Sequence, residues 1–278
     1  MVNSKLKAGY LYVANKKKFF EEAKVSAQSI RQFSSLPIAL IASENSIDES
    51  VKDFFDIIIV VNELNEYTYL SKIIGLQNSP FDKTIFLDSD TFVCSDISEL
   101  FILLDLVDIA TTQESKKHTH SFPEMKYKNI FPEFNSGVIL FNKNESIQKL
   151  FQDWLEICKS LNIQIDMPGL REAIILNFSS IKYSILPECY NSHGYKTMLM
   201  LEGEIKVIHE RLGANWKTWT PFYMSFEKMS KFSKKINKYH YKRIYIPFLG
   251  LIPYYYSPSN ILIKFKKMLG IKRTSKNR

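Results

Sequence analysis

Short apolar runs alternate with amphipathic segments over the N-terminal third of the chain. Runs of this kind are typical of parallel strands that are buried on both faces of a sheet. Three of them are predicted, at residues 8–14, 37–42 and 56–61. Between the first two, apolar residues recur at the spacing of one helix face and predict a helix over residues 19–33.

The same alternation continues to about residue 209. A helix predicted over residues 69–77 precedes an apolar strand at residues 84–87. Further strands are predicted at residues 134–141, 181–186 and 205–209, and further helices at residues 145–160 and 168–177. Strands that alternate with helices predict a doubly wound α/β sheet. Ligands of such sheets bind beyond the carboxyl ends of the strands.

The strand at residues 84–87 ends in two carboxylates, Asp88 and Asp90, which are separated by Ser89. Residues i and i+2 of an extended chain point the same way, so both carboxylates can face one spot beyond the strand. Two carboxylates at such short range repel each other unless a cation or a proton lies between them. Oxygen ligands favour Mg²⁺ or Mn²⁺, and such ions commonly bind phosphates as well. The sequence therefore predicts a metal site that binds a phosphate compound.

Length and composition limit the class of protein. At 278 residues the chain can form one large α/β domain, or one domain with an appendage. Cys94, Cys158 and Cys189 are widely spaced and form no disulfide framework, so we expect free thiols and a cytoplasmic location. We expect no signal peptide, because the N-terminus lacks an apolar core. No apolar run approaches the roughly 18 residues of a membrane-spanning helix.

The net charge of +8 is unevenly distributed. Residues 228–278 hold 14 lysines and arginines and no acidic residue, whereas residues 1–227 have a net charge of −6. We expect a main domain over residues 1–221 and a basic, aromatic-rich appendage over residues 222–278. Basic residues mixed with large apolar ones favour an anionic membrane surface as partner. The alternatives are a solvated or packed basic face and, without any supporting motif, nucleic acid.

Residues 84–101, TIFLDSDTFVCSDISELF, resemble the DxD segment of GT-A glycosyltransferases. Within that fold the chain is most similar to glycosyltransferase family 8, the group of glycogenin and the lipopolysaccharide galactosyltransferases, over residues 8–217. The resemblance implies a GT-A (Rossmann-like) mixed, mostly parallel sheet flanked by helices. It also implies that Asp88 and Asp90 bind Mn²⁺ (or Mg²⁺), and that Ser89 lies beside the donor.

Two further segments match the family. In the first, Phe134–Val138 (FNSGV), the resemblance places Asn135, Ser136 and Gly137 along the donor sugar, with Asn135 bonded to a sugar hydroxyl. The alternative is a tight turn in which Gly137 only provides backbone freedom. The second, DMPGLREA, places Asp166 beside the reacting sugar; its alternative role is to cap the helix that Pro168 opens. Methionine stands at position 167, where the family has glutamine, so the catalytic role of that glutamine is missing or moved.

The resemblance also implies a third metal ligand, His209, at the end of a predicted strand. An imidazole nitrogen suits Mn²⁺ better than Mg²⁺. Gly213 and Lys217 match family residues that approach the diphosphate, where the lysine would neutralise the leaving group. The remaining histidines are expected on the surface or in loops; they are His118, His120, His193 and His240.

The first predicted strand ends in Val13, Ala14 and Asn15, which correspond to the nucleotide-base site of the family. Lys72 lies on the helix before the carboxylate strand, close to where the family has a basic donor-binding residue. The alternative is that Asn15 and Lys72 are ordinary solvated residues, since single polar residues are common on loops and helices.

The expected function is metal-dependent transfer of a hexose from a nucleoside diphosphate sugar, with UDP as the nucleotide, to an acceptor hydroxyl with retention. The acceptor would be a glycan, a lipid-linked sugar or a protein, and the enzyme would be peripheral on the cytoplasmic membrane face. Two alternatives keep the fold: an inverting relative, and an inactive nucleotide-sugar-binding protein. A nucleotidyltransferase is disfavoured, because residues 15–18 contain lysines but no glycine.

Overall fold

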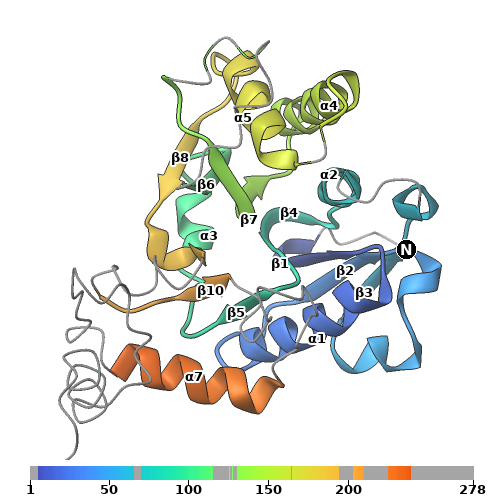
Figure 1. Cartoon of the computed structure of the whole chain (residues 1–278), viewed down its shortest axis with the longest axis vertical. Coiled ribbons are helices and arrows are strands. Elements are labelled where there is room, and N and C mark those ends of the chain that lie inside the picture. The colour runs from blue at the N-terminus through green and yellow to red at the C-terminus, as the bar shows by residue number, and fades with distance from the viewer. Residues whose placement is uncertain are drawn as a thin grey trace, which may run out of the picture.

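A seven-stranded sheet forms the centre of the molecule (Figure 1). The computed structural model describes residues 6–65, 70–114, 125, 127, 130–163, 165–193, 203–209 and 225–238. The strands are β1 (Leu6–Ala14), β2 (Ile38–Ala42), β3 (Ile57–Val60), β4 (Phe81–Leu87), β6 (Ile109–Gln113), β7 (Phe134–Asn142) and β8 (Tyr183–Leu186). They lie in the order β3-β2-β1-β4-β7-β6-β8, and only β7 runs antiparallel to its neighbours. The predicted mixed, mostly parallel sheet is confirmed.

Helices cover both faces of this sheet. Alternate side chains of β1 point to opposite faces: Tyr10 and Tyr12 enter one core and Leu11 enters the other. The first core packs against α1 (Lys17–Arg31) and α3 (Leu100–Leu103), and the second against α2 (Ser71–Gln77), α4 (Glu145–Ser160) and α5 (Asp166–Leu176). Short 3-10 helices complete the connections; they are Glu44–Ser46, Glu49–Asp53, Asn62–Asn65 and Glu188–Tyr190.

A second, three-stranded sheet lies at the carboxyl end of β4. Its strands are β5 (Thr91–Val93), β10 (Val207–His209) and β9 (Ser192–His193), in the order β5-β10-β9. β10 runs antiparallel to β5 and parallel to β9. Because β5 begins directly after the carboxylate pair, this sheet returns a distant part of the chain to the end of β4.

Helix α7 (Phe226–Lys238) packs against the body of the molecule. Met229 is buried beside Phe92 of β5, and the ring centroids of Phe92 and Phe226 lie 5.9 Å apart. Lysines at positions 228, 231 and 234 are exposed. The start of the basic segment thus fits the alternative of a packed basic face, whereas residues 239–278 lie outside the described residues. The domain boundary near residue 221 stays a prediction.

All three cysteines lie among the described residues. Cys94, Cys158 and Cys189 are free. Burial raises the pKa of the Cys94 and Cys158 thiols to about 12, so both are unreactive at neutral pH. Among the described residues, no helix has the length and apolar character that crossing a membrane requires.

Candidate active site

The turn that follows β4 directs its carboxylates away from the sheet. The Oγ1 of Thr91 donates a hydrogen bond of 2.8 Å to the carbonyl of Asp88, which closes the turn. The Oγ of Ser89 donates a bond of 2.8 Å to Glu22 Oε2, a buried carboxylate on α1. Anchored on α1 in this way, the turn leaves the Asp88 and Asp90 side chains half-buried beyond the strand end.

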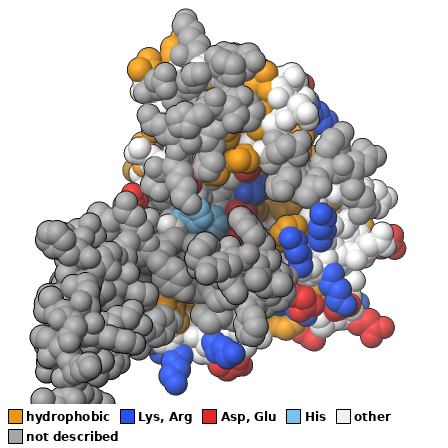
Figure 2. Space-filling view, viewed as in Figure 1, with side chains coloured by type: hydrophobic (Ala, Val, Ile, Leu, Met, Phe, Trp, Pro, Cys, Tyr) orange, Lys and Arg blue, Asp and Glu red, His pale blue; other side chains and the backbone are white. Residues whose placement is uncertain are grey.

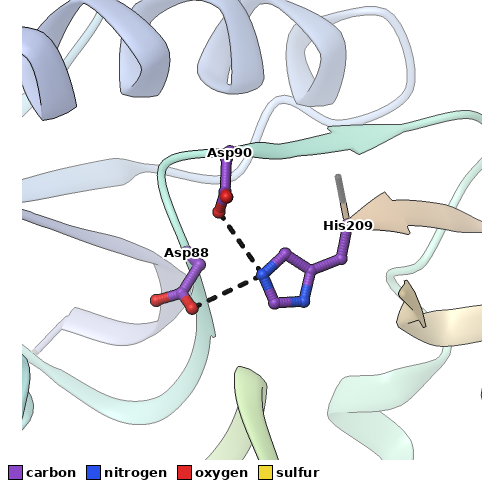
Figure 3. Close-up of side chains that lie close together, drawn as sticks. All are labelled: Asp88, Asp90 and His209. Carbon is purple, nitrogen blue, oxygen red and sulfur yellow. Dashed lines mark ion pairs between the residues drawn. The ribbon is translucent and has the colours of Figure 1, made fainter. Parts of the chain in front are cut away.

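His209 reaches the carboxylates through strand pairing. In the β5–β10 register His209 lies opposite Thr91, so its ring comes beside Asp90. Its Nε2 is 3.3 Å from Asp90 Oδ1 and 3.6 Å from Asp88 Oδ2 (Figure 3). Neighbouring ligands of an octahedral Mg²⁺-sized ion are about 3 Å apart, given metal–ligand distances of about 2.1 Å. Two carboxylate oxygens and one imidazole nitrogen at these separations fit a Mn²⁺ or Mg²⁺ ion.

Gly137 of β7 provides the space that the His209 ring occupies. A Cβ atom at this position would overlap the Cε1 and Nδ1 atoms of His209. The Gly137 carbonyl also accepts a 2.8 Å bond from the backbone N–H of Asp88, so the same residue touches two of the three candidate metal ligands. Gly137 has no positive φ, and the alternative that it only provides backbone freedom is therefore wrong.

A lysine lies between α5 and the group formed by Asp88, Asp90 and His209, which we call the metal group. The Nζ of Lys72 is 2.9 Å from Asp88 Oδ1, 3.2 Å from Asp166 Oδ2 and 2.9 Å from Ser136 Oγ. The Ser136 hydroxyl in turn donates a 2.6 Å bond to Asp166 Oδ2. Figure 2 shows histidine, acidic and basic side chains meeting in the middle of this face. Residues predicted from four separate segments thus form one cluster.

The charges of this cluster influence each other strongly. Burial opposes the charge of Lys72, but Asp166 and Asp88 outweigh burial and raise the pKa of the ammonium above its ordinary value. Burial also opposes a charged His209 ring, yet the Asp90 and Asp88 carboxylates outweigh it and raise the pKa of the imidazole. Burial raises the pKa of the Asp88 carboxyl although Lys72 and His209 oppose the shift. A buried carboxyl whose pKa is raised in this way would be stabilised in its charged form by a bound cation.

The cluster lies at a cavity of about 210 Å³. The cavity is lined by Val13, Asn15, Phe19, Ser71, Lys72, Phe86, Asp88, Ser89, Asp90, Asp166 and His209. Of the residues predicted at the nucleotide, Ala14 is instead fully buried, and its carbonyl accepts a 2.8 Å bond from the hydroxyl of Ser46. Phe19, Ser71 and Phe86 were missed; Phe19 directly follows the lysines after β1, but a single aromatic residue in an amphipathic helix is no signal of a site.

Asn135 is buried and its side chain faces other protein groups. Its Nδ2 donates a 2.6 Å bond to Glu114 Oε2, and its Oδ1 accepts a 2.9 Å bond from the Gly137 N–H. The expectation that Asn135 contacts a sugar hydroxyl stays a prediction. Glu114 is buried at the end of β6 and was not predicted, because nothing in its local sequence distinguishes it.

His193, expected as a surface or loop residue, keeps a partly exposed side chain but belongs to the small sheet. It lies in β9, and its ring packs against that of His209 with centroids 4.9 Å apart. The β9–β10 pairing places the two histidines side by side, a contact that sequence spacing does not reveal. Gly213, Lys217, His118, His120 and His240 lie outside the described residues.

Helix α5 begins at Asp166, two residues before Pro168. The N-cap position is occupied by Ile165, and no side chain caps the helix with a hydrogen bond. The alternative role of Asp166 as the helix cap is therefore wrong. The Asp166 carboxylate instead binds Ser136 and Lys72, while its carbonyl accepts a 2.8 Å bond from Trp154 Nε1. Met167 is half-buried and does not line the cavity.

Solved structures of sugar-transferring enzymes share this fold. LgtC, crystallised with donor and acceptor sugar analogs, is 15% identical with a TM-score of 0.53, over 81% of this chain and 95% of LgtC. GlyE of Streptococcus pneumoniae TIGR4 is 16% identical with a TM-score of 0.55, and the match covers 98% of this chain and 66% of GlyE. Mouse xyloside xylosyltransferase 1 is 15% identical with a TM-score of 0.50, and the match covers 76% of this chain and 99% of the mouse enzyme. At such identities the likeness establishes the fold.

The sequence itself matches one known family. The family described as Glycosyl transferase family 8 matches residues 63–221, more than half of the chain. No curated protein sequence matches the chain. The matched stretch contains both carboxylates of the turn after β4, Asp166 and His209, which the fold brings to one cavity. The chain belongs to glycosyltransferase family 8 and is a glycosyltransferase of the GT-A fold.

Proposed function

We propose that this enzyme transfers a hexose from a UDP-sugar to an acceptor hydroxyl, with retention, in a reaction that requires Mn²⁺. The observation that carries the proposal is the meeting of Asp88, Asp90 and His209 at a cavity that Lys72 also lines. A bound Mn²⁺ supplies positive charge next to the phosphates of the leaving nucleoside diphosphate. The imidazole among the ligands favours Mn²⁺ over Mg²⁺.

The residues around the metal group have separate roles in this proposal. Lys72 now neutralises Asp88, and a cation at Asp88 would allow its ammonium to turn to a donor phosphate or hydroxyl. Asp166, held by Ser136, accepts hydrogen bonds from hydroxyls of the donor or acceptor. We place Gly213 and Lys217 at the diphosphate by family resemblance. Fixed charges of this kind accelerate a reaction in which negative charge grows on the leaving group.

The nucleoside is proposed to bind at Val13, Asn15 and Phe19. All three line the cavity; Val13 lies near the carboxyl end of β1, the neighbour of β4, and Asn15 and Phe19 follow that end. Asn15 offers a polar side chain to the pyrimidine edge. Phe19 offers an aromatic ring, and base–aromatic stacking is worth about 1–3 kcal/mol.

Release of UDP from a panel of UDP-hexoses, measured with and without Mn²⁺, tests this function. We expect UDP release that depends on the sugar, stops when EDTA removes the metal, and returns when Mn²⁺ is added. A donor-bound protein that releases no UDP with any sugar or acceptor would favour the inactive nucleotide-sugar-binding protein. No binding of UDP in the presence of Mn²⁺ would contradict both.

The methionine at position 167 supports the alternative that the protein binds a nucleotide sugar without transferring it. Methionine offers no strong hydrogen bond at the position where the family has glutamine. Since its side chain does not line the cavity, we expect Met167→Gln to leave the Kd for UDP unchanged and turnover at or above the wild-type value. Steady-state kinetics and UDP titration measure this. Slower turnover with unchanged UDP affinity would contradict it, and activity that appears only in the variant would identify the wild type as a binder.

We also propose that the C-terminal region holds the enzyme at an anionic membrane with a lipid-linked acceptor. The exposed Lys228, Lys231 and Lys234 of α7 begin a stretch of 14 basic residues without an acid. Each base near such a surface contributes about 1 kcal/mol.

Deleting residues from Asn260 onward is expected to weaken binding to phosphatidylserine vesicles at low salt and to spare Mn²⁺-dependent UDP release. High salt should have the same effect on the full chain, because it screens the attraction. Vesicle co-sedimentation measures the binding. Full-length protein that ignores anionic vesicles at low salt would contradict the proposal.

A further inference from the structure

The ring of His209 has two nitrogens, and only an unprotonated one can bind a cation. Its Nε2 faces Asp88 and Asp90 (Figure 3), whereas its Nδ1 lies 2.8 Å from the Oδ1 of Asn191. Hydrogen positions and amide orientations follow from the partners of each group. The partners here extend in an unbroken line from His209 to Asn191, Asn135 and Glu114, which we call the amide relay.

The orientation of the Asn135 amide is fixed at the far end of the relay. The backbone N–H of Gly137 can only donate, and it lies 2.9 Å from one side-chain atom of Asn135. That atom must therefore be Oδ1. The other is Nδ2, which donates to Glu114 Oε2 at 2.6 Å.

The orientation of Asn191 follows from that of Asn135. The Oδ1 of Asn135 can only accept, so the Asn191 atom 2.8 Å away must be the donor Nδ2. The same Nδ2 lies 2.8 Å from Thr112 Oγ1. The Oδ1 of Asn191 consequently faces His209. An amide oxygen cannot donate, so Nδ1 of His209 must carry the hydrogen.

We infer that Asn191, oriented by Asn135, is a positioning residue that holds neutral His209 in the Nδ1–H form and leaves the Nε2 lone pair directed at the cation site. Asn191 and Asn135 are each 4% exposed, so water competes little for these bonds. Residues in this role commonly fix ring orientation and metal affinity. The inference rests on the proposed metal site, but it assigns a task to residues outside the ligand set.

The hydrogen position can be measured directly in full-length Asp88→Asn/Asp90→Asn protein without metal, because in the wild type without a cation the two carboxylates would attract the hydrogen to Nε2. Long-range proton–nitrogen NMR spectra of ¹⁵N-histidine-labelled protein, recorded at alkaline pH where the ring is neutral, distinguish protonated from unprotonated ring nitrogens. The spectrum of His209→Ala identifies the signals of His209. For this protein with Asn191 intact we expect a protonated Nδ1 and an unprotonated Nε2. For Asn191→Leu, which removes the acceptor, we expect the hydrogen to move to Nε2.

Metal affinity gives the second readout. Titration with Mn²⁺ in the presence of UDP is expected to show binding to Asn191→Leu that is about 10- to 100-fold weaker than to the wild type. Asn191→Asp keeps the acceptor toward Nδ1 but loses the donor to Asn135 Oδ1, so it should keep the Nδ1–H form. Thr112→Val is the matched control, because it removes an equally short bond to Asn191 Nδ2 but leaves the relay intact. It should change neither readout.

Two results would overturn the inference: a hydrogen on Nε2 in Asp88→Asn/Asp90→Asn protein with Asn191 intact, or an Asn191→Leu substitution that changes neither the tautomer nor the Mn²⁺ affinity. If Asn191→Leu does not fold, the spectrum with Asn191 intact still decides. A wild type that binds no Mn²⁺ with UDP would instead contradict the metal site and the proposed function. The tautomer measurement needs no metal, so the two failures are distinguishable.

Discussion

Replacing Asp88 by asparagine is expected to abolish Mn²⁺-dependent binding of UDP and to leave the fold intact. The substitution keeps the shape of the side chain but removes a charge that a cation requires, and it leaves Lys72 with Asp166 as its remaining carboxylate partner. Asp90→Asn should have the same effect. His209→Ala removes a neutral ligand and should weaken Mn²⁺ binding by about 10- to 100-fold. Calorimetric titration with Mn²⁺ and UDP measures all three.

Asp105→Asn is a suitable control for these variants. It also separates an aspartate from a lysine partner, Lys83, but its side chain is exposed and remote from the cavity lining. Its Mn²⁺ and UDP binding should equal that of the wild type. A structure with Mn²⁺ and UDP in which Asp88, Asp90 or His209 lies beyond about 3 Å from the ion would contradict the ligand assignment.

Adding a single methyl group at Gly137 is expected to eliminate the metal site. The new Cβ would overlap the His209 ring, whose Nδ1 side is held by Asn191 and whose face packs on His193. Close-packed interiors relieve such overlaps only by displacing the ring or the strand. We expect Mn²⁺ affinity in the presence of UDP to fall at least as far as in His209→Ala, that is, by about 10- to 100-fold or more.

A double-mutant cycle tests the cause of this effect. If the methyl group acts through the His209 ring, then Gly137→Ala should produce little further loss in a His209→Ala background. Gly169→Ala is the matched control, since its Cβ would overlap the Sγ of Cys158 on α4 and not a candidate metal ligand. It should lower the unfolding temperature without changing Mn²⁺ affinity. Equal Mn²⁺ binding by Gly137→Ala and the wild type would disprove the steric argument.

Most of the large sheet could be predicted from the apolar pattern. The runs that became β1, β2, β3, β4, β7 and β8 are long or continuous enough to be recognised. Strand β6 was missed because its sequence, IATTQ, contains threonines and a glutamine, although four of its five residues are buried. The antiparallel direction of β7 could not be predicted, because a run of apolar residues does not indicate in which direction the strand crosses the sheet. Strands β5 and β9 are too short to show any period.

The metal group was predictable for a different reason. Asp88 and Asp90 are neighbours in sequence, and family resemblance supplied His209. Asn191, Glu114 and His193 were missed because each contacts the site only through long-range strand pairing or hydrogen bonds. The position of Gly137 was predicted, but the reason for a glycine there, room for an imidazole from β10, depends on a contact between distant segments.

The place of His209 on β10 has a consequence for mechanical coupling. The segment that separates Asp90 from His209 includes β6, β7, α4, α5 and β8, which is nearly half of the large sheet with its helices. A cation held at both ends of this segment acts as a reversible cross-link that closes a long loop of chain. It also adds an anchor to a strand of only three residues. A bound cation would therefore raise the free energy of local unfolding throughout the C-terminal half of the domain.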